Sequence, residues 1–86
     1  MITPANAPLV TPRVYIDLPV TDDEMEFIPR SYPRLSVALT GRQQNAGPEF
    51  RLEGELPDIM DYLVQDSAMT IAEIFQTTKY IRLASQ

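Results

Sequence analysis

The chain has 86 residues, with 12 acidic and 7 basic side chains and therefore a net charge of -5. It contains no cysteine and no histidine, which excludes disulfides, thiolate metal sites and the histidine-activated nucleophiles of many enzymes. This length allows one domain, and 44% hydrophobic with 22% charged residues is typical of a folded globular protein.

The N-terminal segment 1–12 is rich in proline. Its prolines recur at every fourth position, at Pro4, Pro8 and Pro12. Each proline fixes its own φ angle and favours extended backbone in the preceding residue, so we expect an extended arm before a single domain at 13–86. One interpretation is an inert chain end. The alternative is an arm that lies along another subunit or partner, with Leu9 and Val10 in contact.

Residues 13–18 alternate between polar and apolar side chains, which predicts a half-buried β-strand that Pro19 ends. Thr21 and Glu24 then have the spacing of a helix capping box. They predict a short helix over 22–28 that Pro29 stops.

The next two predicted strands form a hairpin. The alternation covers 34–40 with Leu35, Val37 and Leu39, and then Glu49 to Leu56 with Phe50 and Leu52. The connection from Gly41 to Pro48 is longer than a tight turn requires, so we expect a mobile, solvated loop. Gly54 falls on the apolar side of the second strand and indicates a bulge or the close approach of another element.

Two helices are predicted for the remainder, and residues 79–84 are left open between strand and helix. Pro57 suits a first helical position, and the helix after it places four apolar residues on one face, namely Ile59, Met60, Leu63 and Val64. A second capping box at Thr70 and Glu73 starts a helix whose inward residues are expected to be Ile74, Phe75 and Thr78. Residues 80–83 alternate and suit a strand. The order of elements predicts an α+β fold, a small antiparallel sheet of three or four strands with two or three short helices packed on one face.

The residue inventory predicts no enzyme. Lys79 is the single lysine and resembles a solvated surface residue, and Glu53 with Glu55 resembles the acids of any exposed strand. The glycines are scattered, and the acidic run 22–26 lacks the spacing of a calcium loop, so we expect no catalytic residue, no cofactor and no metal. The basic residues form no stripe and no apolar run approaches the ~18 residues of a membrane helix, so we expect no direct nucleic-acid binding, no membrane contact and an intracellular location.

The acidic residues concentrate in two segments, 17–26 and 49–66. They are interpreted either as solvated outer faces or as a patch that is complementary to a basic protein surface, in its strongest form a mimic of nucleic-acid phosphates. The candidate partner-binding residues are Asp22, Asp23, Glu24, Glu26, Glu49, Glu53, Glu55, Asp58 and Asp61.

These features predict a non-enzymatic protein-binding module that docks on a larger protein through its acidic faces, an exposed strand edge or the arm. An inhibitor of a host enzyme or defence complex, encoded by a phage or another mobile element, is a concrete version that rests on analogy between classes of small proteins. The alternative is a structural assembly subunit that forms a homo-oligomer through its N-terminal arm and strand edges.

Overall fold

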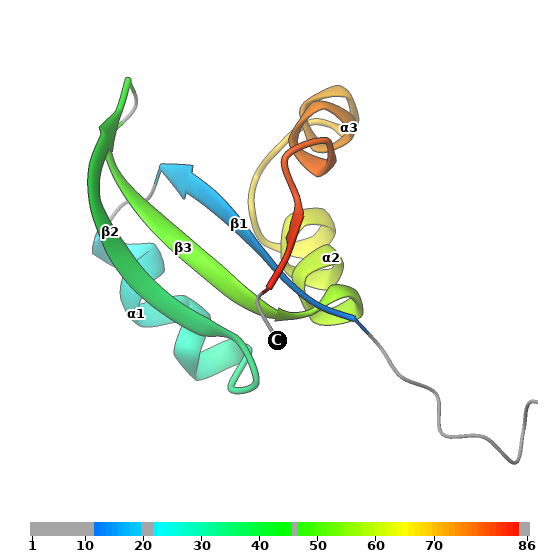
Figure 1. Cartoon of the computed structure of the whole chain (residues 1–86), viewed down its shortest axis with the longest axis horizontal. Helices are drawn as coiled ribbons and strands as arrows, with labels where there is room; N and C mark the ends of the chain where they lie inside the picture. Colours follow the sequence, from blue (N-terminus) through cyan, green and yellow to red (C-terminus); the bar gives the residue numbers. More distant parts are fainter. Residues whose placement is uncertain (1–11, 20–21, 46, 85–86) are drawn as a thin grey trace, which may run out of the picture.

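The computed structural model describes residues 12–19, 22–45 and 47–84, which form a four-stranded antiparallel sheet with three helices (Figure 1). The strands are β1 (Arg13–Pro19), β2 (Ser36–Gln44), β3 (Gly47–Glu55) and β4 (Arg82–Leu83), and the helices are α1 (Asp22–Ser31), α2 (Leu56–Gln65) and α3 (Ile71–Thr78). The order across the sheet is β2, β3, β1 and β4. The predicted α+β fold is confirmed, and the segment 79–84, for which the sequence leaves strand and helix both open, contains the two-residue strand β4.

One face of the sheet forms the hydrophobic core, because buried and more exposed residues alternate along β1 and β3. The register pairs Ile16 with Leu52 and Leu18 with Phe50, so these four side chains lie together. Helices α1 and α2 cover this face, and the rest of the core consists of Val14, Ile28, Leu35, Ile59, Tyr62 and Leu63. The opposite face of β1 and β3 is therefore left to polar side chains.

The first helix runs further than expected. Helix α1 continues through Pro29 to Ser31, so the prediction that Pro29 ends it is wrong. A proline this close to the C-terminal end removes one intrahelical hydrogen bond where few remain to be made. The fully buried Ile28 accepts a hydrogen bond from the Tyr32 N–H at 2.7 Å, which holds the last turn in place. Thr21 of the predicted capping box lies outside the described residues.

The hairpin connection is shorter than expected. Strand β2 extends to Gln44 and β3 begins at Gly47, so the prediction of a loop from Gly41 to Pro48 is wrong. A register irregularity between Leu39 and Gln43 absorbs the extra residues, and Gly41 there has a φ of 87°. Such an irregularity lets a strand continue after one pairing register is lost.

The two later helices differ from their predicted faces. In α2 the buried residues are Ile59, Tyr62 and Leu63, whereas Val64 is exposed. In α3 no residue is buried, and Phe75 is 69% exposed, so the expected inward position of Phe75 is wrong. Helix α3 is anchored instead by the residues that flank it, because Met69 and Ile81 pack against the core.

The start of α3 agrees with the sequence. The Glu73 N–H donates to the Thr70 hydroxyl at 3.1 Å, and the Thr70 N–H donates to the Glu73 carboxylate at 2.9 Å. The second capping box is thereby confirmed. Among the described helices, none is long and apolar enough to cross a membrane. The predicted arm falls almost entirely on residues 1–11, which lie outside the described part of the chain.

Candidate protein-binding surface

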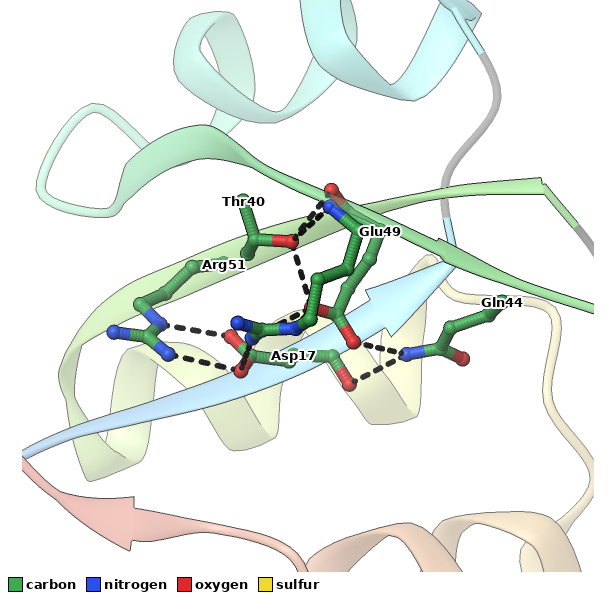
Figure 2. Close-up of polar contacts among 6 residues, drawn as sticks. Asp17, Thr40, Gln44, Glu49 and Arg51 are labelled. Carbon is green, nitrogen blue, oxygen red and sulfur yellow. Dashed lines mark hydrogen bonds and ion pairs between the residues drawn. The ribbon is translucent and has the colours of Figure 1, made fainter.

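The polar face of the sheet carries a cluster of ion pairs that links β1, β2 and β3 (Figure 2). Asp17 and Arg51 are direct neighbours in the register. The Arg51 guanidinium donates to both carboxylate oxygens of Asp17, at 2.8 and 3.0 Å, and Arg42 donates to the same carboxylate at 3.1 Å. A two-pronged contact of this kind fixes orientation as well as charge, so the polar face of β1 is held rigidly at Asp17.

Glu49 is the centre of this cluster and is only 8% exposed. Its carboxylate accepts hydrogen bonds from the Thr40 hydroxyl at 2.7 Å, the Arg42 guanidinium at 2.7 Å and the Gln44 amide at 2.9 Å. The hydrogen bonds from Thr40 and Gln44, with the charge of Arg42, hold the pKa of Glu49 below its usual range. All three donors come from the second half of β2, so the Glu49 carboxylate links the irregular stretch of β2 and its last residue to β3.

Arg51 also stacks on an aromatic ring. Its guanidinium carbon lies 4.1 Å from the centre of the Tyr15 ring, which is a cation–π contact. Its hydrogen bonds to Asp17 raise the pKa of Arg51, so the guanidinium is permanently charged. With two acids and two arginines, the cluster balances its own charge.

We expect Glu49→Gln to weaken the acid dependence of folding. Because the pKa of Glu49 is lowered in the folded state, its stabilising contribution is fully present above the unfolded value near 4.5 and is lost as the pH falls through the folded value. Urea unfolding should therefore show a lower stability for the variant at about pH 7 and a smaller difference at about pH 3. Glu26→Gln, at an exposed position on α1, is the matched control. Parallel pH curves for wild type and Glu49→Gln would contradict this role.

The outer edge of β1 is only partly paired. Strand β4 pairs with β1 at Val14 and Tyr15, and the Ala84 N–H donates to the Arg13 carbonyl at 2.9 Å. Consecutive residues of a strand direct their backbone groups to opposite edges, so the odd-numbered residues of β1 face this outer edge. No described strand continues the ladder to Asp17 or Pro19. The Asp17 N–H and the Pro19 carbonyl are thus available to a further strand, and the Asp17 carbonyl has only a long contact of 3.5 Å from the Gln44 amide.

An open groove of about 750 Å³ lies between this free edge and α3. One side is lined by β1 from Tyr15 to Pro19, and Arg82 of β4 also lines the groove. The other side is formed by Ala72, Glu73, Gln76, Thr77 and Tyr80. Figure 1 shows α3 beyond β1, on the side away from β2. The Glu73 carboxylate is already used in the capping box, and Asp17 and Glu49 are already paired with arginines.

The other side of α3 is apolar and exposed. Ile71 is 74% exposed and Phe75 is 69% exposed, and both lie one helical turn apart on the same side of α3. Successive helical residues are ~100° apart, so the groove-wall positions 72, 73, 76 and 77 are centred on the side of α3 away from Ile71 and Phe75.

The nine acidic residues predicted to bind a partner do not form one patch. Glu49 and Glu53 lie on the polar face of the sheet, where Glu53 pairs with Arg13 at 3.0 Å. The residues on α1 and α2 lie on the opposite, core-covering side, where Asp58 pairs with Arg34 and Glu24 accepts a hydrogen bond from the Tyr62 hydroxyl. Asp23, Glu26, Glu55 and Asp61 are exposed, and Asp22 begins α1. Their role in binding stays a prediction.

The groove itself was not among the predicted sites. The alternation of 13–18 indicates that Tyr15 and Asp17 share a polar face, but the free edge exists because β4 is only two residues long. The groove also requires α3 to stand beside the sheet. Neither feature has a local sequence signal.

The described residues offer little reactive chemistry. They contain no group of three side chains that could hold a metal ion. The hydrogen bond to Asp66 raises the pKa of Tyr32 to about 12, and burial with a hydrogen bond to Glu24 raises the pKa of Tyr62, so both phenols stay protonated at neutral pH. No protein-family model, curated protein or solved structure matches the chain.

Proposed function

We propose that this chain is a non-enzymatic protein-binding domain, which receives an extended segment of another polypeptide in the groove between β1 and α3. The observation that carries the proposal is the free outer edge of β1 at Asp17 and Pro19. Backbone N–H and C=O groups need hydrogen-bond partners, and an added strand supplies them in a fixed register.

The rigidity of the edge supports this proposal. Arg51 and Arg42 clamp the Asp17 carboxylate, and Arg51 is itself packed on Tyr15, so the edge does not have to be ordered when a partner binds. Binding loses less conformational entropy when one surface is preorganised. The wall opposite carries the small side chains of Ala72 and Thr77, which leave room for side chains of the incoming segment.

The added segment could come from a different protein or from another copy of this chain. The first corresponds to the inhibitor of a larger enzyme or defence complex, in which the exposed acids of α1 and α2 would steer a basic partner surface into place. The second corresponds to the assembly subunit. The free strand edge supports both forms, because strand addition requires no particular partner identity.

Ala72→Lys tests the use of the groove. A lysine at this position keeps helix propensity but places a long, charged side chain in the groove, as natural edge strands do to prevent strand addition. Random linear peptides selected on the immobilised wild-type protein should bind Ala72→Lys about tenfold more weakly or worse, as measured by fluorescence anisotropy.

Val64→Lys is the matched control, because Val64 is 58% exposed on α2 and does not line the groove. Selected peptides should bind this variant as they bind the wild type. Selection that enriches no peptide, or peptides that bind Ala72→Lys unchanged, would refute the proposed function.

A further inference from the structure

We infer that the groove is occupied by residues 1–11 of a second copy of this chain, so that two copies exchange their N-terminal arms. The inference rests on the proposed function, because it names the occupant of the same groove. Four observations lead to it: the positions of the prolines, the location of β4, the charges around the groove and the reach of the arm.

The prolines of the arm leave one strand edge intact. A proline lacks the backbone N–H and is tolerated in a sheet only where that missing donor faces away from the neighbouring strand. Because Pro4, Pro8 and Pro12 are all even-numbered, an extended arm would lose donors from a single edge. The other edge keeps every N–H, at Thr3, Ala5, Ala7, Leu9 and Thr11. This arm suits an outermost strand, and its proline edge would prevent a third chain from adding.

The position of β4 favours a second copy over the same chain. Each arm precedes Arg13, at the end of β1 where β4 already covers the outer edge at Val14 and Tyr15. The groove begins beside this pairing, at Tyr15 and Arg82, and extends along β1 toward its other end at Pro19. An arm from its own chain would have to reverse and pass β4, whereas an arm from a second copy can enter beyond Pro19.

The charges of the groove disfavour a basic occupant, since Arg82 also lies in the lining. Residues 1–11 contain no charged side chain. The acids near the groove are engaged, Asp17 and Glu49 by arginines and Glu73 by the N-terminus of α3, so a basic segment finds no unpaired carboxylate in the lining. Small side chains such as Ala5 and Ala7 suit a site between a strand and a helix.

The arm is long enough for exchange. Eleven extended residues span about 36 Å, whereas the seven residues of β1 span about 23 Å. Reciprocal exchange uses the same groove and the same arm on both copies, so it gives a closed dimer with twofold symmetry.

Light scattering of the full chain tests the inference. A mass near twice 9.7 kDa is expected at high protein concentration for the wild type and for Val64→Lys, and a mass near 9.7 kDa for Ala72→Lys. A synthetic peptide of residues 1–12, added in excess, should convert the wild-type dimer to monomers. The Asp17 amide should exchange its hydrogen slowly in the dimer and rapidly in Ala72→Lys.

Backbone N-methylation supplies the matched comparison, because it removes a donor and keeps the side chain. A peptide methylated at Ala7 and Leu9 should lose about tenfold or more in competition, whereas one methylated at Asn6 and Val10 should compete like the unmodified peptide. Equal competition by both methylated peptides would refute strand addition through the odd-numbered edge. A wild-type mass of 9.7 kDa at all concentrations, or a dimer that resists the unmodified peptide, would refute arm exchange. Neither result would refute the proposed function, because that function is tested separately by the binding of selected peptides to the wild type and to Ala72→Lys.

Discussion

Phe50→Ala is expected to lower the free energy of unfolding by about 3 to 5 kcal/mol, whereas Phe75→Ala should change it by about 0.5 kcal/mol or less. The two substitutions remove the same atoms from different surroundings. Phe50 is fully buried in β3 between the sheet and its covering helices, and Phe75 is 69% exposed on α3. Urea unfolding at low protein concentration measures both values on the monomer.

The magnitude at Phe50 matters because a domain of this size has a small stability. With a total of about 5 to 15 kcal/mol for natural domains, Phe50→Ala would bring the chain close to unfolding. Phe50→Leu keeps most of the apolar volume and gives a folded variant from which a smaller loss can be measured. A loss of several kcal/mol at Phe75 would contradict the placement of α3, since it would mean that this helix packs into the core.

The elements that could be predicted are those with a local cause. The alternation of polar and apolar residues in β1 exists because one face of the strand is buried. It can be recognised from the segment itself, without knowledge of the neighbouring strands. The capping box of α3 is equally local, because Thr70 and Glu73 satisfy each other's backbone donors. Both signals survive because no distant contact opposes them.

The predictions that failed depend on distant partners. The segment from Gly41 to Pro48 has the composition of a loop, yet its residues continue the hairpin, and Thr40, Arg42 and Gln44 all donate hydrogen bonds to Glu49 across it. Pro29 lies inside α1 because the neighbouring Ile28 is needed in the core. In each case a tertiary contact outweighs a local preference.

The candidate site was harder to predict than the fold. The sequence shows how many acids the chain carries but not their partners, and Glu49, Glu53 and Asp58 are all in ion pairs. An acidic side chain whose charge is neutralised by a neighbouring arginine attracts a charged ligand only weakly. The free edge of β1 depends on where β4 stops. Whether the backbone N–H and C=O groups of a strand are unpaired cannot be recognised from the types of its side chains.

Gly54→Val is expected to lower the free energy of unfolding by about 1 to 3 kcal/mol. Gly54 lies in β3 opposite Val14, away from the one irregular stretch of the described ladder, so close approach rather than a bulge accounts for this glycine. A Cβ atom built there would overlap the Leu35 side chain and lie 3.4 Å from the Arg34 carbonyl. Leu35 is itself buried in the core, so it cannot move away without disturbing its neighbours.

A graded set of variants separates this overlap from the general effect of a branched residue. Gly54→Ala should cost less than Gly54→Val, because the tip of Leu35 can rotate away from a single carbon atom. Ala38→Val, at an exposed position of β2, should stay within about 0.5 kcal/mol of the wild type. In a double-mutant cycle, Leu35→Ala should reduce the cost of Gly54→Val by about 0.5 kcal/mol or more, because the two residues then no longer compete for one space. Additive costs would mean that Gly54 is required for its backbone and not for the room that it leaves to Leu35, and the start of β2 would then be held by some other contact.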